Sequence, residues 1–335
     1  MNSPQRAWKS FTPGAAWIVC ACVCAWTLGA HGQSNSAYPQ RPIRFIVAFP
    51  PGSSTDIAAR AIAARTGTAI SQNIVIDNRS GASGQIGAEL GARAAPDGYT
   101  MLIGTTSTHA LAAVLNRKLP YHPQRDFQPV TLIGSSPYVL ALHPAIPATS
   151  VKELIALARE RPGQLRYASA GNATLGHLAG ELFASSAAVQ LTHVPYKSSA
   201  QAAPDVLAGR IDMQFGSVPP TLPHVQSGKL RAIAVTGVRR LANLPQIPTV
   251  AEAGIPGYEV TLWMGVFMPA GTPAQFVELL GRELNAAIGS RDITDLLASH
   301  GIEAESGGAK PLAALVASEV AKWRKVAIAA RIEPQ

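Results

Sequence analysis

Beyond its N-terminal segment, this sequence alternates short runs of β-branched and apolar residues with alanine-rich stretches, and this alternation leaves few possible folds. The pattern begins with Ile43 to Phe49, continues through a helical stretch from about Ser54 to Ile70, and returns to an apolar run at Ile74 to Ile76. Strands that alternate with helices form parallel sheets covered by helices. The sequence therefore predicts an α/β protein.

Later parts of the chain repeat this rhythm. Further strands are predicted at Met101 to Gly104, Tyr138 to Leu142, Leu165 to Ser169, Leu191 to Tyr196, Ile211 to Phe215, Arg231 to Thr236 and Glu259 to Met268. Ser150 and Glu153 have the spacing of a capping box, and Pro273 is predicted at the first position of another helix. Apolar residues from Leu312 to Ala327 recur at helical spacing, which predicts a packing helix near the C-terminus.

The first residues predict export. Arg6 and Lys9 precede an uncharged apolar run from Gly14 to Gly29, and the small residues Ala30 and Gly32 follow. This layout is typical of a secretory signal peptide, residues 1–32, cleaved near Gly32. The apolar run is shorter than the roughly 20 residues that cross a bilayer, so we interpret it as a leader rather than a transmembrane anchor. The mature chain of about 300 residues is expected in the periplasm, and its length favours two domains.

Cysteine and charge exclude several classes of protein. Cys20, Cys22 and Cys24 all lie in the predicted leader, so the mature chain has no thiol for a disulfide, a nucleophile or a metal site. Without the leader the formal net charge falls from +8 to +6, since two of 28 basic residues are lost and 20 acidic ones stay. The basic residues are spread over many predicted helices, so we expect no nucleic-acid partner and only weak steering of anions.

Two segments share the order strand, glycine with small polar residues, helix. The first is Pro50 to Thr55 after the first strand, and the second is Ala170 to Thr174. A helix start exposes unpaired N–H groups and the positive end of the helix dipole, so a carboxylate there gains hydrogen bonds without a cationic side chain. Two such turns, one from each lobe, would hold a small acid between them. Spacing alone leaves open a purely structural role as tight turns with N-caps.

No catalytic or cofactor motif accompanies these turns. The sequence contains no Gly-x-Ser-x-Gly elbow, His-Glu-x-x-His pair or Walker loop. Gly81, Gly84 and Gly87 read as an ordinary turn into a helix, and the histidines after the leader show no metal-ligand spacing. We expect no cofactor, no metal and no catalytic residue; a periplasmic hydrolase or transferase is the alternative.

A series of motifs along the chain is shared with one family. They are Tyr38 to Gly52 followed by Asp56, Ala59 and Arg60, then Asp77 to Arg79, Gly84 to Gly87, Pro96 to Thr100, Leu119 to Tyr121, Tyr167 to Ser169, His177 to Phe183, His193 to Lys197, Gly228 to Ala232, Pro248 to Gly254 and Pro269 to Pro273. In this order they resemble signatures of the Bug proteins, the TctC-type receptors of tripartite tricarboxylate transporters. The resemblance covers essentially the whole mature chain.

The resemblance implies a two-lobed periplasmic-binding-protein fold, venus-flytrap and type II-like, with two crossing hinge segments. We place the crossings near Thr131 to Leu142 and Tyr258 to Met268, lobe 1 at residues 38–138 plus 263–335, and lobe 2 at residues 139–262. It also implies a receptor that passes a small organic carboxylate to membrane transporter subunits; a sensing adaptor for a membrane sensor is the alternative. We expect a monomer. A dicarboxylate, a hydroxyacid, an acidic amino acid and an aromatic acid all stay open as ligand.

By matching position, the resemblance also implies a ligand site made of two loops and a wall. The first loop is Phe49, Pro51, Gly52, Ser53, Ser54, Thr55 and Asp56, the second is Ala170, Gly171, Asn172, Ala173 and Thr174, and the wall is Thr105, Thr106, Ser107, His177, Tyr196, Lys197, Asp212 and Phe215. Structural alternatives stay open for six of them: a first-turn acid for Asp56, capping or packing for His177, local backbone bonds for Asp212, a surface position for Lys197, and filling of the lobe interface for Phe49 and Tyr196.

The chain departs from the family pattern at three positions. Ser53 stands where the family often has a second glycine, Ser198 where it often has a glycine, and His122 where it often has an aspartate. Ser53 puts in doubt a turn that needs a positive φ at this position, and Ser198 raises the same doubt for the second lobe. We interpret His122 as a surface change.

Overall fold

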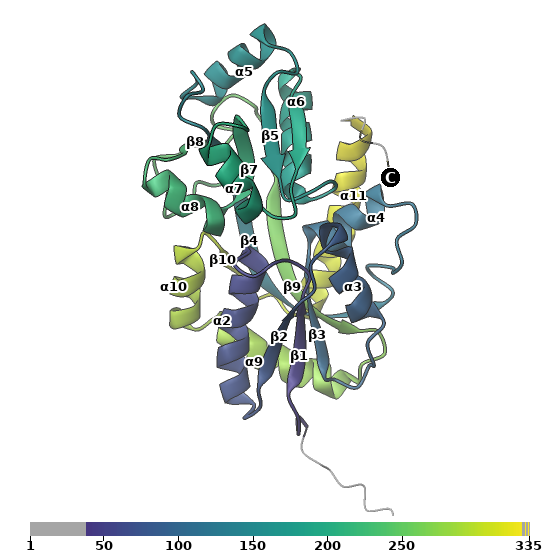
Figure 1. Ribbon diagram of the computed structural model, residues 1–335. Coiled ribbons are helices and arrows are strands. Elements are labelled where there is room, and N and C mark those ends of the chain that lie inside the picture. Colours follow the sequence, from purple (N-terminus) through teal and green to yellow (C-terminus); the bar gives the residue numbers. More distant parts are fainter. Residues whose placement is uncertain (1–37, 330–331, 333, 335) are drawn as a thin grey trace, which may run out of the picture. The chain divides into compact units, whose positions relative to one another are not determined.

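The computed structural model describes residues 38–329, 332 and 334, so the predicted leader lies outside the described residues. The described helices and strands all belong to one unit, Arg41–Gln335 (Figure 1). Its strands are β1 (Ile43–Val47), β2 (Ile74–Asn78), β3 (Thr100–Thr105), β4 (Phe127–Leu142), β5 (Arg166–Ser169), β6 (Thr192–Pro195), β7 (Met213–Ser217), β8 (Arg231–Val235), β9 (Thr261–Pro269) and β10 (Glu303–Ala304). Its helical segments are α2 (Ser54–Ala69), η1 (Ala82–Gly84), α3 (Gln85–Ala92), η2 (Thr106–Leu111), α4 (Ala112–Leu115), α5 (Val151–Glu160), α6 (Leu175–Ala187), α7 (Ser199–Leu207), α8 (Val218–Gln226), α9 (Ala274–Ile288), α10 (Arg291–Ser299) and α11 (Ala309–Ala329).

The strands pair in the order β2-β1-β3-β9-β4-β7-β5-β6, and β8 and β10 also pair with β4. β1 runs parallel to β2 and β3, and β5 runs parallel to β6 and β7. The alternation of the sequence predicts such parallel groups with helices between the strands. The two groups are the cores of the two lobes of a type II-like binding-protein fold, which the family resemblance implied. Parallel strands bring the helix starts that follow them to one edge of each group.

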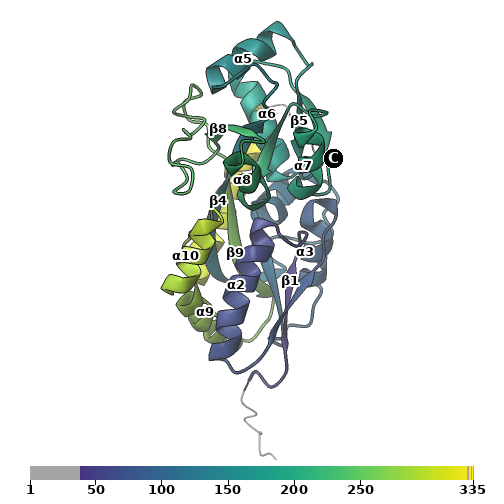
Figure 2. The same ribbon diagram turned by 60° about the vertical axis from the view of Figure 1, so that its left-hand side comes forward.

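Two antiparallel strands connect the lobes. The first part of β4, up to Pro137, pairs with β9, and its last part, from Tyr138, pairs with β7 and β8. Figure 2 shows β4 and β9 running between the two groups of strands. The two crossing segments predicted from the resemblance are therefore these strands, although β4 already begins at Phe127.

Register shifts interrupt β4 where it pairs with β9. Gly134 lies at one of them with φ +151°, and a Cβ at this position would collide with the backbone carbonyl of Glu303 in β10. A bulge bends a strand and increases its twist. The bend in β4 thus requires a glycine, and β10, which the sequence analysis did not predict, packs directly against it.

The apolar residues of the C-terminal helix pack on the first group of strands. Leu312, Val316 and Trp323 are buried, and Leu312 and Val316 belong to one cluster with Ile46 and Phe267. α11 contacts β4 and η2, and α9 and α10 contact α2. The prediction of a packing helix near the C-terminus is confirmed, because its apolar face covers residues of β1 and β9.

The two predicted helix starts differ in outcome. Ser150 caps α5, since its hydroxyl accepts a hydrogen bond from the Glu153 N–H, but the Glu153 carboxylate bonds the N–H of Thr149 instead of that of Ser150. Pro273 is the residue before α9 rather than its first helical residue. Both helices therefore begin where predicted to within one residue, with different local bonds.

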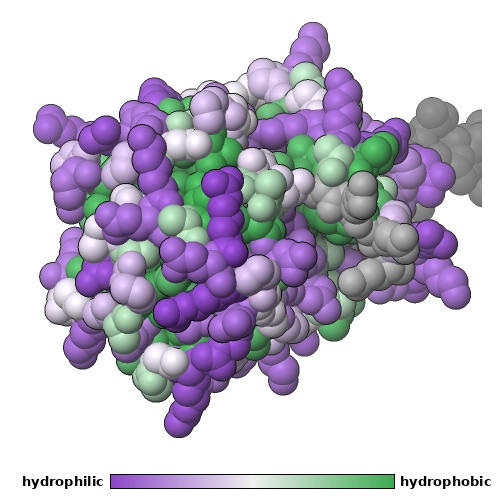
Figure 3. Space-filling view, turned by 90° about the horizontal axis from the view of Figure 1, so that it is seen from above, coloured by the Kyte–Doolittle hydropathy of each residue, from purple (hydrophilic) through white to green (hydrophobic). Residues whose placement is uncertain are grey.

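No described helix combines the length and the apolar composition that a membrane span needs. Figure 3, viewed from above, shows hydrophilic side chains projecting across this face, with hydrophobic ones in the recesses between them. The exposed large hydrophobic side chains come from β2, α3, α10, α11 and the segment after β8: Val75, Ile86, Leu90, Leu296, Ile328 and Val238. Singly exposed residues of this kind are normal on protein surfaces.

Candidate functional site

Two strand-to-helix turns, one from each lobe, line a common small cavity. The first turn joins β1 to α2 and the second joins β5 to α6. The cavity measures about 50 Å³, and its wall is Phe49, Pro50, Ser53, Ser54, Thr55, Ser107, Tyr138, Ala170, Thr174, Lys197, Ser198, Ser199, Ser217 and Leu262. Because α2, α6, α7 and α8 all start at residues of this wall, their N-termini converge on it.

A larger cavity of about 700 Å³ adjoins the small one. Its wall is Ala48, Phe49, Pro50, Ser80, Gly81, Ala82, Ser83, Gly84, Gln85, Ala112, Leu115, Asn116, Ala170, Gly171, Asn172, Ala173, Tyr196 and Lys197. Phe49, Pro50, Ala170 and Lys197 line both cavities. The two spaces are thus neighbouring compartments of one site between the lobes.

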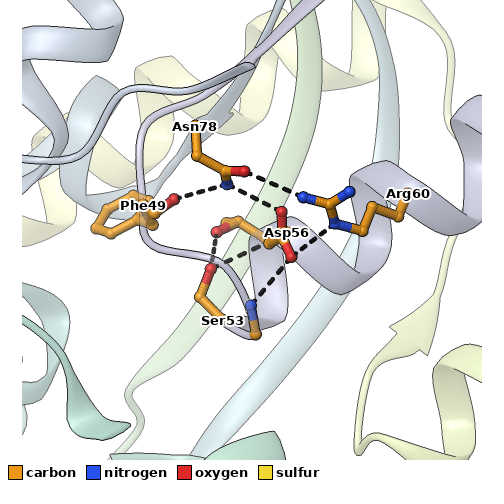
Figure 4. Close-up of polar contacts among 7 residues, drawn as sticks. Phe49, Ser53, Asp56, Arg60 and Asn78 are labelled. Carbon is orange, nitrogen blue, oxygen red and sulfur yellow. Dashed lines mark hydrogen bonds and ion pairs between the residues drawn. The ribbon is translucent and has the colours of Figure 1, made fainter. Parts of the chain in front are cut away.

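The first turn is held in shape by Asp56 (Figure 4). The Asp56 carboxylate accepts hydrogen bonds from the Gly52 N–H at 3.0 Å, from Asn78 Nδ2 at 2.9 Å and from Arg60 Nε at 2.9 Å. Asn78 also donates to the carbonyl of Phe49. Burial raises the pKa of Asp56, but the hydrogen bonds from Arg60, Asn78 and Gly52 outweigh it and hold the pKa below its ordinary value. The buried, charged Asp56 therefore holds the first turn in its conformation through these hydrogen bonds.

The two serine departures from the family pattern are both helix N-caps. Ser53 has φ −72° and its hydroxyl accepts from the Asp56 N–H, while the positive φ of this turn, +77°, belongs to Gly52. Ser198 has φ −163° and accepts from the Gln201 N–H. Neither position needs a glycine, so the doubt raised by the sequence is removed. The third departure, His122, is exposed, as predicted.

The start of α2 leaves hydrogen-bond donors open toward the small cavity. Among the described residues, the backbone N–H groups of Ser54 and Thr55 have no protein partner, whereas those of Asp56 and Ile57 bond to Ser53. Ser54 is 2% exposed and its hydroxyl also has no partner. A buried polar group without a partner is rare in native proteins and calls for a ligand or water.

The second turn has the same character. Its backbone takes positive φ angles at Gly171 and Ala173, and the Thr174 hydroxyl donates to the Gly171 carbonyl at 2.7 Å. No side chain caps α6, and within the described chain the N–H groups of Leu175, Gly176 and His177 have no protein partner. The first and last turns of any helix need such partners. The start of α6 is therefore a second set of free donors.

A direct contact joins the two lobes beside the larger cavity. The hydroxyl of Ser83, in η1, donates to the backbone carbonyl of Asn172 in the second turn. Both residues line the larger cavity. The second turn thus contacts η1 of the other lobe at this wall.

His177 does not line either cavity. Its Nδ1 accepts from the Ala173 N–H, and its ring lies 4.2 Å from the ring of His193, whose Nε2 is 2.7 Å from Ser169 Oγ. Burial lowers the pKa of His177, against the effect of Glu181, and burial with the neighbouring His177 lowers the pKa of His193 to about 3. The geometry favours the capping and packing interpretation of His177.

The structure brings most of the predicted site residues together. Phe49, Ser53, Ser54, Thr55, Ser107, Ala170, Gly171, Asn172, Ala173, Thr174, Tyr196 and Lys197 line one or both cavities. Pro51 and Gly52 are exposed on the first turn, and Asp56 supports it. Thr105 caps η2, and the buried Thr106 bonds the backbone of Thr261 and Trp263, so these two act on the framework behind the wall.

Asp212 and Phe215, which were predicted as wall residues, line neither cavity. β7 was predicted from Ile211 to Phe215, but it runs from Met213 to Ser217. Asp212 therefore precedes the strand, at the end opposite the helix starts, where its carboxylate accepts from the Arg166 N–H at 2.7 Å. Phe215 is 0% exposed and packs its ring on Tyr167 and Phe183.

Several wall residues were not predicted. Ser198, Ser199 and Ser217 line the small cavity, and Ser199 Oγ accepts from the Ser217 N–H. The available signal was a hydroxyl residue directly before a helix at the end of a strand, as for Ser53. The segment 80–85 and Asn116 of the larger cavity carried no such signal.

The charge of the site is simple. Lys197 is the only charged side chain that lines either cavity in the described chain, and it makes no ion pair there. Within residues 38–329, 332 and 334, no cluster of His, Cys, Asp and Glu is arranged to hold a metal ion. Free N–H groups, hydroxyls and one cation without a facing carboxylate suit an anion.

Comparison with known proteins identifies the family. The model of the tripartite tricarboxylate transporter family receptor matches residues 58–331. A protein from the tcbD-tcbE intergenic region of Pseudomonas sp. strain P51 is 41% identical over 307 residues, 91% of each chain. Protein BugT of Bordetella pertussis is 35% identical over 294 residues, 88% of this chain and 90% of BugT.

A solved structure agrees with this assignment. Rpa4515 of R. palustris, solved with adipate, is 39% identical and superposes with a TM-score of 0.84 over 89% of this chain and 100% of its own. The family model and the solved structure thus each match most of the chain. The chain therefore belongs to the TctC receptors of the tripartite tricarboxylate transporter family, the Bug proteins.

Proposed function

We propose that this protein is a periplasmic receptor that captures a small organic carboxylate in the small cavity between its lobes. One observation carries the proposal: the starts of α2 and α6, from opposite lobes, present free N–H groups to one cavity that no acidic side chain of the described chain lines. A relative solved with adipate supports it.

The recognition rests on backbone donors. Each helix start carries about half a positive charge and several N–H groups that point along the axis, so a carboxylate there is bound by several hydrogen bonds at once. The Ser54 hydroxyl adds a buried donor. Lys197 lies at the junction of the two cavities and supplies attraction over a longer distance. These groups hold the acid without any bond being made or broken.

Ligand release requires the lobes to separate. We assign residues 38–138 plus 263–335 to lobe 1 and residues 139–262 to lobe 2, with β4 and β9 as hinges. Binding-protein lobes close around a ligand by rotation about such crossing segments. The Ser83 contact to Asn172 belongs to the closed arrangement in this proposal, because it joins η1 of lobe 1 to the second turn, in lobe 2, at the wall of the larger cavity.

The proposed cellular location and partner rest on the family and on the predicted signal peptide. Export with cleavage near Gly32 would deliver the protein to the periplasm as a monomer that needs no cofactor. Its partner is the set of membrane transporter subunits, which receives the ligand when the lobes open. A receptor of this kind leaves its ligand chemically unchanged, so we propose no catalytic activity.

A thermal-shift screen of the exported protein against a library of organic acids tests the proposal. A ligand at about a hundred times its dissociation constant adds roughly 2.7 kcal/mol to the free energy of unfolding. For a chain of this size we expect the melting temperature to rise by about 5 to 10 °C. Amides of the same acids serve as controls and should give no shift. No response to any acid would refute carboxylate capture, and turnover of a bound acid would refute the receptor role.

A further inference from the structure

We infer that the ligand carries its charge at one end only: a carboxylate in the small cavity and an uncharged, aromatic body in the larger one. This inference rests on the proposed function and specifies its ligand class. It follows from how volume and charge are divided between the two cavities and from the aromatic residues of their walls.

Volume separates a head from a body. The small cavity, about 50 Å³, has room for only a few water-sized groups, and a carboxylate is of this size. The larger cavity, about 700 Å³, falls within the usual range for the sites of drug-sized ligands. A short acid would fill the first and leave the second occupied by water, so the site is built for a longer molecule.

Charge is confined to the junction. Lys197 lines both cavities and no other charged side chain in the described chain lines either. A second carboxylate in the body of the ligand would lie in the larger cavity without a cation of its own. Taking an ion out of water without a partner costs several kcal/mol. One anionic end next to Lys197 fits this distribution, and two do not.

Three polar side chains at the larger cavity already have hydrogen-bond partners. Asn116 Nδ2 donates to Gln85 Oε1 at 2.7 Å, Ser83 donates to the Asn172 carbonyl, and the Tyr196 hydroxyl donates to Asp205 at 2.6 Å. Ser54, in the small cavity, is unpaired by contrast. Among these hydroxyl and amide groups, the one without a partner therefore lies in the small cavity, where the head would bind.

The start of α3 at the larger cavity follows the same rule. The N–H groups of Gly84 and Gln85 bond to the carbonyls of Gly81 and Ala82. The next residue of the helix, Ile86, is not part of the cavity wall. The start of α3 itself therefore offers no free N–H on this wall, whereas the N–H groups of Ala82 and Ser83, in η1 directly before it, have no protein partner among the described residues.

Aromatic surface selects the kind of body. Phe49 is one of the residues that line both cavities, and Tyr196 and Leu115 add apolar surface to the wall of the larger one. Alanines at positions 48, 82, 112, 170 and 173 leave the space open. Aromatic side chains pack well against a planar ring in offset or edge-to-face arrangements. The site thus suits an arylalkanoate better than an aliphatic diacid.

Calorimetry of the exported protein with two acids of similar size tests the inference. We expect 3-phenylpropanoate to bind at least about tenfold more tightly than adipate. The neutral 3-phenylpropanamide should bind far more weakly than its acid. Tighter binding of adipate would overturn this inference and leave carboxylate capture intact. Binding of neither acid, together with a failed acid screen, would overturn the proposed function and this inference with it.

Two variants test the placement of the head and the body. Lys197→Met should weaken 3-phenylpropanoate binding by about tenfold and flatten its dependence on salt, because an exposed attraction is screened. Lys152→Met, on α5, is the matched control and should bind like the parent protein. Phe49→Ala should weaken 3-phenylpropanoate more than adipate. Unchanged affinity in Lys197→Met, or equal losses for both acids in Phe49→Ala, would refute the assignment.

Discussion

Replacing Ser54 by alanine separates a ligand contact from a structural side chain. The Ser54 hydroxyl is buried in the wall of the small cavity and has no hydrogen-bond partner. A buried polar group left unpaired costs about 1–3 kcal/mol. In the absence of ligand we therefore expect the free energy of unfolding of Ser54→Ala to equal that of the parent protein or to exceed it by up to about 2 kcal/mol.

With ligand the same substitution should act in the opposite direction. A hydrogen bond to a charged group contributes about 1.5–3 kcal/mol. Its loss corresponds to an increase in the dissociation constant of about 10- to 100-fold, since each 1.4 kcal/mol is tenfold. The two effects have opposite signs, and no purely structural role of Ser54 produces that combination.

Ser53→Ala is the matched control, one residue away. The Ser53 hydroxyl caps α2 by accepting from the Asp56 N–H, and loss of such a cap costs about 0.5–2 kcal/mol. Urea denaturation of the ligand-free proteins measures stability, and calorimetry with the acid that gives the largest thermal shift measures affinity. If Ser54→Ala lost more than about 1 kcal/mol of stability and bound as tightly as the parent, Ser54 would be structural and the reasoning wrong.

Three further substitutions have expected outcomes. Asp56→Asn should lower the free energy of unfolding by about 1.5–3 kcal/mol at neutral pH, because hydrogen bonds to a charged group are lost. The pKa of Asp56 is lowered in the folded state, so its charge stabilises the protein above about pH 3.9, and this stabilisation is lost as the pH falls through the folded pKa. Acid denaturation should therefore show the stabilities of the variant and the parent protein converging. Gly84→Ala should lower the free energy of unfolding by about 1–3 kcal/mol and also weaken ligand binding, since φ is +91° and a Cβ would lie 3.0 Å from the Phe49 ring. Gly52→Ala is the control, because φ is +77° and a Cβ there would have no atom within 4 Å. Equal losses of affinity in the two variants would contradict the expectation. Trp323→Ala should cost about 3–5 kcal/mol by calorimetric unfolding, because this side chain is 1% exposed; a loss below about 1 kcal/mol would show that α11 does not stabilise lobe 1.

The local pattern of the sequence determined the elements and the two principal turns. Short apolar runs and helical spacing depend only on neighbouring residues, so β1, β5 and the helices after them lie close to their predicted positions. Hydroxyl residues at helix starts were readable for the same reason. The family resemblance then supplied the two-lobed arrangement and most of the wall of the small cavity.

Only the tertiary structure decided which of the predicted residues meet. A shift of two residues in β7 places Ser217 rather than Phe215 at the end where the helices start, and leaves Asp212 at the other end. Strand boundaries depend on pairing with β4 and β5, which are distant in sequence. A local pattern therefore does not determine them.

The role of Asp56 shows the same division. Its place in the first turn of α2 is legible in the sequence, but its partner Asn78 lies 22 residues away and reaches it only because β1 and β2 pair in parallel. The convergence of α7 and α8 on the small cavity likewise follows from the strand order β7-β5-β6. Local sequence determined what each turn offers, and the long-range pairing of strands, set by burial of the whole core, decided what it faces.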